Sequence, residues 1–390
     1  MNQPLDSKVQ RTVRWLRNIW KRTEGRPRFV AFSAGKDSLV LAAMLYEAVE
    51  EESPPCLHVK HDFQLPTDSW YLDMLRERGF DIQVLHPFLE YFELIDRGIG
   101  FPTKTEPWCI PMLIGSAFLE WLRLRGAPGP RAGVMFRGVS GSEWSRKYHA
   151  PLEVYQRLDL PTVNPILLFE TDEIITVLRQ RYGLPLNPLY DKVSRTYCIC
   201  CYAPDRQRQA YAEAQFPSVH SQFYGHIEQC LFGSDLIEPS RVPKRYRTRQ
   251  EQLGEHGFMH WRRSPRQDAV GAVKRRLRGD ALSYTVREPR WIDAKHFRPV
   301  AGRWARVGND IRFWDTPERQ ADAIMKRMLN CLDCGFCMVQ CFSCRQFDRD
   351  AGELRIEGCL QCGKCLNLRY CMGWKHRFWR RVIVEANDVR

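Results

Sequence analysis

The stretch FVAFSAGKDSL, residues 29–39, constrains the fold of this chain more than any other. Its first four residues are apolar and predict a buried strand, and the residues after Ser38 predict a helix. A strand that runs through a glycine-bearing turn into a helix is a ready anion site, because the N–H groups and the dipole at the helix start favour negative charge. Lys36 adds a positive charge, Ser33 and Ser38 add hydroxyl donors, and Gly35 lets a phosphate approach the backbone. The simpler alternative is an ordinary polar turn.

Asp37 is unusual in a turn that would bind phosphate. Its carboxylate makes sense either as a cap of the following helix or as a ligand of Mg²⁺. The turn is not a Walker A motif, because the pattern G-x-x-x-x-G-K-[ST] is absent.

Strands and helices alternate over the first half of the chain. Apolar runs predict strands at residues 29–32, 56–60, 81–85 and 134–136, and helical periodicity predicts helices at residues 8–24, 38–51, 67–78, 110–125 and 171–182. This order is typical of an α/β fold with a mostly parallel sheet and helices on both faces. After about residue 235 the alternation fades, although residues 284–314 favour a small β-rich insert and residues 316–329 a helix.

The chain is basic, with a net charge of +13 over 390 residues. Residues 241–280 hold twelve lysines or arginines and four acidic residues, so 12 − 4 = +8 of that charge lies in one segment. Nucleic acid is therefore a candidate partner, and a solvated basic surface is the simpler alternative. Neither a secretory signal nor an apolar run long enough to span a bilayer is visible, so we expect a cytoplasmic protein that does not enter a membrane.

Nine of the fifteen cysteines lie between Cys331 and Cys371, and eight of them form two runs. In a cytosolic chain such runs favour metal or iron–sulfur ligation over disulfides. The spacing C-x₂-C-x₂-C-x₃-C is that of a bacterial ferredoxin run, and the second run has a last gap of five residues. The runs comprise Cys331, Cys334, Cys337 and Cys341, then Cys359, Cys362, Cys365 and Cys371.

These runs resemble the two-cluster ferredoxin fold. The resemblance implies one [4Fe-4S] cluster on Cys331, Cys334, Cys337 and Cys371, and a second on Cys359, Cys362, Cys365 and Cys341. The proline that usually follows the last cysteine of each run is absent, and Cys344 is left over. Paired zinc ribbons are the alternative.

A further cysteine set, Cys109, Cys198 and Cys201, suggests a third metal centre. Thiolates three residues apart can face one metal, and a distant third closes the site. We expect an iron–sulfur cluster here, with Cys200 or Cys230 as the fourth ligand or with an open iron. A structural zinc site or buried thiols are the alternatives.

Several motifs in order make the N-terminal half resemble a known family. Residues 33–38 look like the SGGKDS loop of the PP-loop ATP pyrophosphatases, whose fold is adenine nucleotide alpha-hydrolase-like. The later motifs resemble the phosphoadenylyl-sulfate (PAPS) reductase branch: HDFQLPT at 61–67, GVSGSEWSR at 138–146, NPI at 164–166, TDEI at 171–174, LNPLYD at 186–191 and CICC at 198–201. The resemblance spans about residues 28–215.

This resemblance implies roles for named residues. It implies nucleotide binding by Ser33, Ala34, Gly35, Lys36, Asp37, Ser38, Asp62 and Arg137, and catalysis by Lys36, Asp37, Glu143 and Arg146. Two departures stand out. Ser140 replaces the usual arginine of the G-[IV]-R loop, so Arg137, Arg146 or Lys147 would hold the anionic end. The segment that resembles the catalytic Glu-Cys-Gly, residues 255–260, has no cysteine.

The expected organisation is an N-terminal helix (1–27), a nucleotide domain (28–235), a basic linker with a small insert (236–325), a ferredoxin-like domain (326–376) and a tail (377–390). Two functions fit it. The first is an oxidoreductase that reduces adenylyl sulfate (PAPS or APS) to sulfite with cluster electrons, which requires an electron donor protein. The alternative is an ATP-dependent adenylylating sulfurtransferase that thiolates DNA or tRNA. A redox adaptor without catalysis is a third, weaker interpretation.

Overall fold

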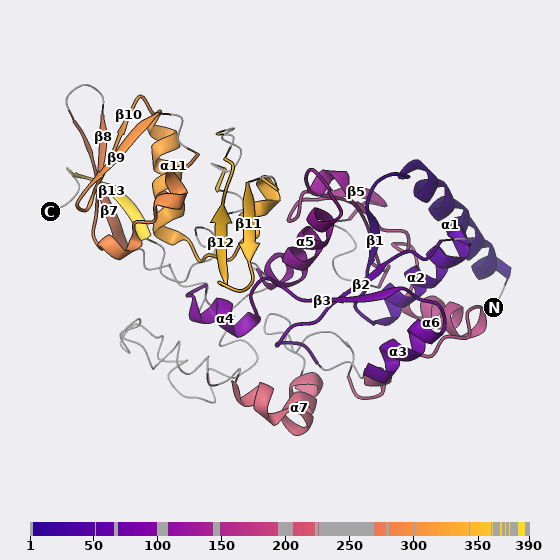
Figure 1. Cartoon of the computed structure of the whole chain (residues 1–390). Coiled ribbons are helices and arrows are strands. Elements are labelled where there is room, and N and C mark those ends of the chain that lie inside the picture. The colour runs from indigo at the N-terminus through magenta and orange to yellow at the C-terminus, as the bar shows by residue number, and fades with distance from the viewer. Residues whose placement is uncertain are drawn as a thin grey trace. The chain divides into compact units, whose positions relative to one another are not determined.

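The computed structural model describes residues 3–50, 52–65, 69–99, 108–142, 149–193, 206–222, 225, 269–277, 281–299, 302–342, 344–359, 361, 367–368, 371, 374 and 381–386. Its elements are drawn in Figure 1. The chain divides into two compact units, Met1–Pro87 with Leu113–Gln222, and Phe88–Met112 with Phe223–Arg390. Each unit is described by itself. In the described part of the chain, no helix combines the length and apolar character needed to cross a bilayer.

The first unit is built on a six-stranded sheet with the order β3-β2-β1-β4-β6-β5. Five strands run parallel, and β5 pairs antiparallel with β6 at the edge. The chain winds outward from β1 through β2 to β3 and then returns to β4 on the other side of β1. The strands are β1 (Arg28–Ala31), β2 (Cys56–Val59), β3 (Ile82–Leu85), β4 (Val134–Arg137), β5 (Leu152–Tyr155) and β6 (Leu160–Val163).

Helices cover both faces of this sheet (Figure 1). On one face α1, α2 and α6 share a core with Val30 and Phe136 of the sheet, and on the other Phe29 stacks against Phe118 and Trp121 of α5. The helices are α1 (Gln3–Arg22), α2 (Lys36–Val49), α3 (Ser69–Glu77), α5 (Ser116–Leu124), α6 (Thr171–Gln180) and α7 (Arg206–Gln215), with 3-10 turns at Pro130–Ala132 and Pro188–Asp191.

The burial of α1 and α2 follows their sequences. In α1 the buried residues recur every three or four positions, which is the period of one helix face. In α2 every residue from 38 to 45 is buried, because the helix lies between the sheet and other helices. The buried residues of α1 are Leu5, Val9, Val13, Leu16, Ile19 and Trp20.

The second unit holds a five-stranded sheet with the order β13-β7-β8-β10-β9. Its apolar face packs against α11, and β13 pairs in parallel with β7 at one edge. A separate hairpin of β11 and β12 follows α11. The elements are α4 (Tyr91–Asp96), β7 (Ala269–Arg276), β8 (Leu282–Val286), β9 (Arg303–Val307), β10 (Asp310–Trp314), α11 (Glu318–Asn330), β11 (Arg345–Asp348), β12 (Glu353–Ile356) and β13 (Arg381–Glu385), with 3-10 turns at Pro289–Trp291, Ala294–Phe297 and Phe336–Gln340.

The α/β class and the mostly parallel sheet are confirmed. The predicted strands and helices of the first unit are found within a few residues, but β5 and β6 were not predicted. The helix expected over residues 110–125 begins as a π-helix at Ile110–Gly115, and α6 has Glu170 rather than Thr171 as its N-cap. The domain boundaries stay predictions. Residue 325 lies inside α11, and β13 belongs to the segment expected to be a tail.

Candidate functional site

The turn after β1 lies at the point where the strand order of the sheet reverses. Strand β1 is flanked by β2 and β4, which the chain reaches in opposite directions. In open α/β sheets, ligands bind outside the carboxyl ends of the strands at such a point. The segments that follow β1 and β4, residues 32–38 and 138–142, therefore form the candidate site.

The turn itself is tightly held. The side chain of Ser38 donates to the Gly35 carbonyl at 3.0 Å and accepts from the Ser33 N–H at 3.2 Å. Ala34 has φ 58°, in the left-handed region, which costs a residue with a β-carbon about 1 kcal/mol relative to glycine. Gly35 is the N-cap of α2, with no side-chain cap hydrogen bond. The turn thus leads into a helix start without a side-chain cap, and anion binding there stays a prediction.

Lys36 and Asp37 form an ion pair beside this helix start. Their Nζ and Oδ2 atoms lie 2.6 Å apart, and both side chains are largely buried. The helix-cap alternative for Asp37 is wrong, because Asp37 lies inside α2 and Gly35 is the cap. The second carboxylate oxygen, Oδ1, is buried and has no hydrogen-bond partner among the described residues. A buried carboxylate oxygen of this kind fits a hard cation such as Mg²⁺.

Residues far along the chain brace the turn, and the sequence reasoning gave them no role. Tyr190 accepts a hydrogen bond from the backbone N–H of Lys36 at 3.0 Å, and Asn187 donates to the Ala34 carbonyl at 3.1 Å. From the β4 side, Gly138 approaches so closely that a β-carbon there would lie 2.7 Å from the Asp37 carbonyl oxygen. The LNPLYD motif at residues 186–191 was the signal that could have identified Asn187 and Tyr190.

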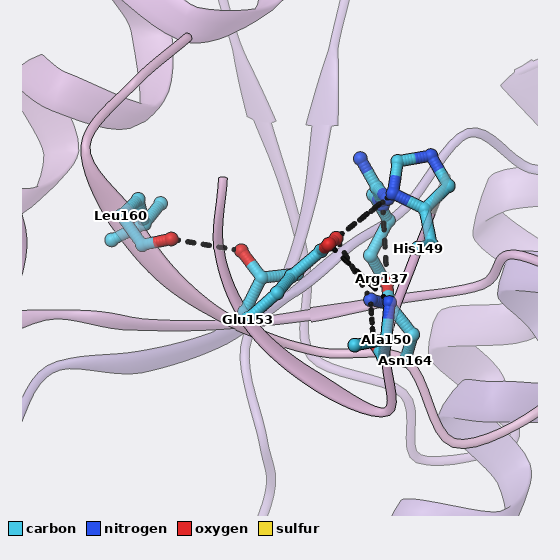
Figure 2. Close-up of polar contacts among 7 residues, drawn as sticks. Arg137, His149, Ala150, Glu153, Leu160 and Asn164 are labelled. Carbon is cyan, nitrogen blue, oxygen red and sulfur yellow. Dashed lines mark hydrogen bonds and ion pairs between the residues drawn. The ribbon is translucent and has the colours of Figure 1, made fainter. Parts of the chain in front are cut away.

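Arg137, at the end of β4, is the centre of a polar network (Figure 2). Its Nη2 lies 2.9 Å from His149 Nδ1 and 3.3 Å from Glu153 Oε1, and its Nε donates to Asn164 at 3.3 Å. Asn164 also donates to Glu153 Oε1 at 3.0 Å. Burial is the main cause that lowers the pKa of His149, and the positive charge of Arg137 lowers it further. The guanidinium predicted to hold an anion is therefore already paired with a carboxylate.

The structure describes some of the other predicted residues of this half and leaves others outside the described ranges. Asp62 follows β2 by three positions, at the same edge of the sheet as the turn. Ser140, in the place of the usual arginine, is fully buried, and its hydroxyl has no hydrogen-bond partner among the described residues. Cys109 is half-buried in the second unit. Glu143, Arg146, Lys147, Cys198, Cys200, Cys201 and Cys230 lie outside the described residues.

In the second unit, the first cysteine run closes around buried sulfur atoms. Burial is the main cause that raises the pKa of the Cys331, Cys334 and Cys371 thiols. Neighbouring cysteines raise the pKa of Cys331 and Cys334 further, whereas the charge of Arg327 partly opposes the rise at Cys371. Arg345, 1% exposed, donates to Cys337 Sγ at 3.0 Å. A buried cation beside grouped thiols fits a centre of negative charge. These four cysteines are the set implied for the first cluster.

The β11–β12 hairpin joins the two cysteine runs. Arg345 pairs with Ile356 in the hairpin register, and the Glu357 N–H donates to the Cys344 carbonyl at 2.9 Å. The end of the first run is thereby brought to Cys359, the start of the second. Cys359 packs against the buried cluster of Cys337, Leu354 and Ile356.

The donor set consists of cysteine thiols, which are ligands both of iron–sulfur clusters and of zinc ions. A zinc ion needs four donors about 2.0–2.3 Å from one point. No group of three or more His, Cys, Asp or Glu side chains meets the requirements of one ion within the described ranges. Cys362 and Cys365 lie outside those ranges, so the set implied for the second cluster is described only at Cys341 and Cys359.

Fold and site together define an α/β protein with a strand-turn-helix at the switch point of its mostly parallel sheet. No protein-family model matches the chain, and no curated protein matches it. Among solved structures, it is similar to a PAPS reductase from Candida auris, with a TM-score of 0.34 and 11% identity over 49% of this chain and 92% of the reductase.

Two further solved structures are similar to the chain. One is an NH₃-dependent NAD synthetase from Campylobacter jejuni, with a TM-score of 0.34 and 15% identity over 61% of this chain and 98% of the synthetase. The other is a U34-tRNA thiolase from Methanococcus maripaludis with its [4Fe-4S] cluster, with a TM-score of 0.31 and 15% identity over 64% of this chain and 90% of the thiolase. At TM-scores below 0.5, none of them assigns the chain to a family.

Proposed function

We propose that this protein is an iron–sulfur enzyme that binds an adenylyl nucleotide at residues 33–38 and carries out sulfur chemistry on it. The observation that carries the proposal is the position of the turn. An α2 N-terminus without a side-chain cap, with Lys36 at its first residue, lies at the β1/β4 switch point. Helix start and lysine charge together favour phosphate oxygens.

The reaction proposed is the reduction of adenylyl sulfate. Two electrons enter the activated sulfate group, the bond between sulfur and the phosphate-linked oxygen breaks, and sulfite leaves while the oxygen stays on the nucleotide. The chain has no cysteine in the segment that resembles the catalytic Glu-Cys-Gly of thiol-dependent reductases. An electron supply other than a thiol is therefore part of the proposal.

The C-terminal cysteine runs are the proposed source of these electrons. Cys331, Cys334, Cys337 and Cys371 would hold one [4Fe-4S] cluster, and Cys359, Cys362, Cys365 and Cys341 the other. Such clusters, when bound, deliver single electrons at low potential. Within the chain itself, Arg345 places a positive charge 3.0 Å from Cys337 Sγ.

A second function is favoured by one specific atom. Asp37 Oδ1 is buried without a hydrogen-bond partner in the described part of the chain, which suits Mg²⁺ binding. Magnesium assists the departure of pyrophosphate from ATP, whereas sulfite release does not require it. In this alternative the protein adenylylates an acceptor with ATP and transfers sulfur to it, and the acceptor is a nucleic acid bound through the basic segment 241–280.

One pair of assays separates the two functions. Anaerobically purified protein is incubated with adenylyl sulfate and a reduced dye, and separately with ATP, Mg²⁺ and candidate nucleic acids. Sulfite release in the first assay supports the reductase. Pyrophosphate release that requires an acceptor, without sulfite in the first assay, would overturn it in favour of the sulfurtransferase. Lys36→Ala is the matched variant, because either activity should fall with it.

A further inference from the structure

Of the nine cysteines between Cys331 and Cys371, Cys344 is the one that has no place in the two implied clusters. It lies between the last cysteine of the first run, Cys341, and strand β11. Its side chain is 4% exposed, and its sulfur lies 2.7 Å from the sulfur of Cys341. Two sulfur atoms without a bond repel at this distance. The two side chains therefore compete for one position rather than filling two.

The backbone fixes both cysteines at this position. The Arg345 N–H donates to the Cys341 carbonyl at 3.2 Å, and the Glu357 N–H donates to the Cys344 carbonyl at 2.9 Å. Cys344 is thus anchored through the hairpin to a residue only two positions before Cys359. Cys341 is anchored to the same hairpin through Arg345. Both cysteines are thereby tied to the hairpin that leads into the second run.

We propose that Cys341 and Cys344 are interchangeable ligands for one iron of the second cluster. The inference rests on the proposed function, since it requires that cluster. With the cluster bound, the Cys344 sulfur would replace the Cys341 sulfur as the iron ligand, and the proton of the Cys344 thiol would pass to the Cys341 sulfur. No electron is gained or lost. The fourth ligand position of the second cluster is then filled after the loss of either side chain.

Alanine variants test the exchange. Serine is avoided because its hydroxyl oxygen could itself bind iron in place of the cysteine sulfur. Cys341→Ala, Cys344→Ala and the double variant are purified anaerobically, and iron and labile sulfide are counted per chain. Each single variant should keep the wild-type iron content, and the double variant should lose the iron of about one [4Fe-4S] cluster. Cys56→Ala is the control, since Cys56 is a buried cysteine in the first unit outside every proposed site.

Three results would overturn the proposal. Cys341→Ala alone could lose as much iron as the double variant, which would make Cys341 the sole ligand, and the same result for Cys344→Ala would make Cys344 the sole ligand. Mass spectrometry of the denatured, unreduced wild-type protein could show the Cys341–Cys344 pair as a disulfide. Wild-type protein that contains no iron would instead refute the proposed function. Circular dichroism melts of every variant ensure that iron loss is compared between folded chains.

Discussion

The backbone of Asp37 lies against Gly138, with a distance of only 2.7 Å between the Asp37 carbonyl oxygen and the place where a β-carbon of residue 138 would be. The neighbouring carbon of Asp37 and the nitrogen of Ser38 are also within 3 Å of that place, at 2.8 and 2.9 Å. All three are backbone atoms, which cannot rotate away. The turn after β1 and the loop after β4 meet here because residue 138 has no side chain.

Gly138→Ala should therefore disturb the candidate site. Forcing a methyl group into such a contact costs about 1–3 kcal/mol and shifts the start of α2. We expect a lower midpoint of thermal unfolding and weaker binding of an adenylyl nucleotide, measured by calorimetry. Gly129→Ala is the control, because a β-carbon there would have no atom within 4 Å. Unchanged affinity in Gly138→Ala would show that the nucleotide does not depend on this contact.

Lys36→Ala should lower the affinity for an adenylyl nucleotide at least about tenfold. Hydrogen bonds to charged groups contribute about 1.5–3 kcal/mol, and 1.4 kcal/mol corresponds to a factor of ten. Titration calorimetry with adenylyl sulfate and with ATP measures the change. Lys21→Ala, at the exposed end of α1, is the control for the loss of one positive charge. Equal affinities in wild type and Lys36→Ala would remove the turn as the binding site.

The sequence predicted this turn because all of its signals are local. A short apolar run, a glycine and a helix start follow one another within eleven residues, so no long-range contact is needed to identify them. The bonds from Asn187 and Tyr190 to the turn span about 150 residues, and no local pattern contains them. Likewise, β5 is a half-exposed edge strand without a buried apolar run, so its residues carried no strand signal.

The role of Arg137 shows a second limit of sequence reasoning. Its position beside the turn could be inferred from the strand order, but its pairing with Glu153 depends on the hairpin of β5 and β6. Because that hairpin was not predicted, the carboxylate that neutralises Arg137 could not be expected. The cysteine ligand sets could be proposed from the sequence because ligand spacing along the chain is itself the signal, and they stay predictions.

The free energy of unfolding should decrease as the pH is lowered from about 6.5 to about 4, in part because of His58. Burial lowers the pKa of His58 from 6.5 to about 4, and its Nδ1 lies 3.1 Å from the Phe32 carbonyl at the entry to the turn. In this window the unfolded chain binds a proton that the folded chain does not, so acid favours unfolding. One such group contributes a slope of about 1.4 kcal/mol per pH unit at most.

His58→Gln should reduce that slope. Urea unfolding at pH 7 and pH 5 measures it, and the difference between variant and wild type isolates His58 from other groups that titrate. His86→Gln, which replaces an exposed histidine, is the control variant measured in parallel. If His58→Gln and wild type lose equal stability between the two pH values, the histidine is not held neutral by burial.

Arg345→Gln should make the reduction potential of the first cluster more negative. The buried guanidinium lies 3.0 Å from Cys337 Sγ, and a positive charge stabilises the reduced, more negative state. Loss of an interaction worth 1.4 kcal/mol corresponds to about 59 mV for one electron. A redox titration followed by electron paramagnetic resonance measures the shift. Arg345→Lys keeps the charge and should stay near the wild-type potential; equal shifts in both variants would point to a packing effect.

The hairpin of β11 and β12 makes the sequence length between the two cysteine runs unimportant. Its paired arms hold Cys344 and Glu357 together at the base, whereas residues 349–352 at the tip take no part in that alignment. A peptide epitope inserted at the tip should leave the metal content intact, while deletion of a single residue from one arm would turn alternate side chains to the opposite face. The number of residues between the two cysteine runs can therefore vary through the tip of the hairpin. Only the pairing register of β11 with β12 has to be kept.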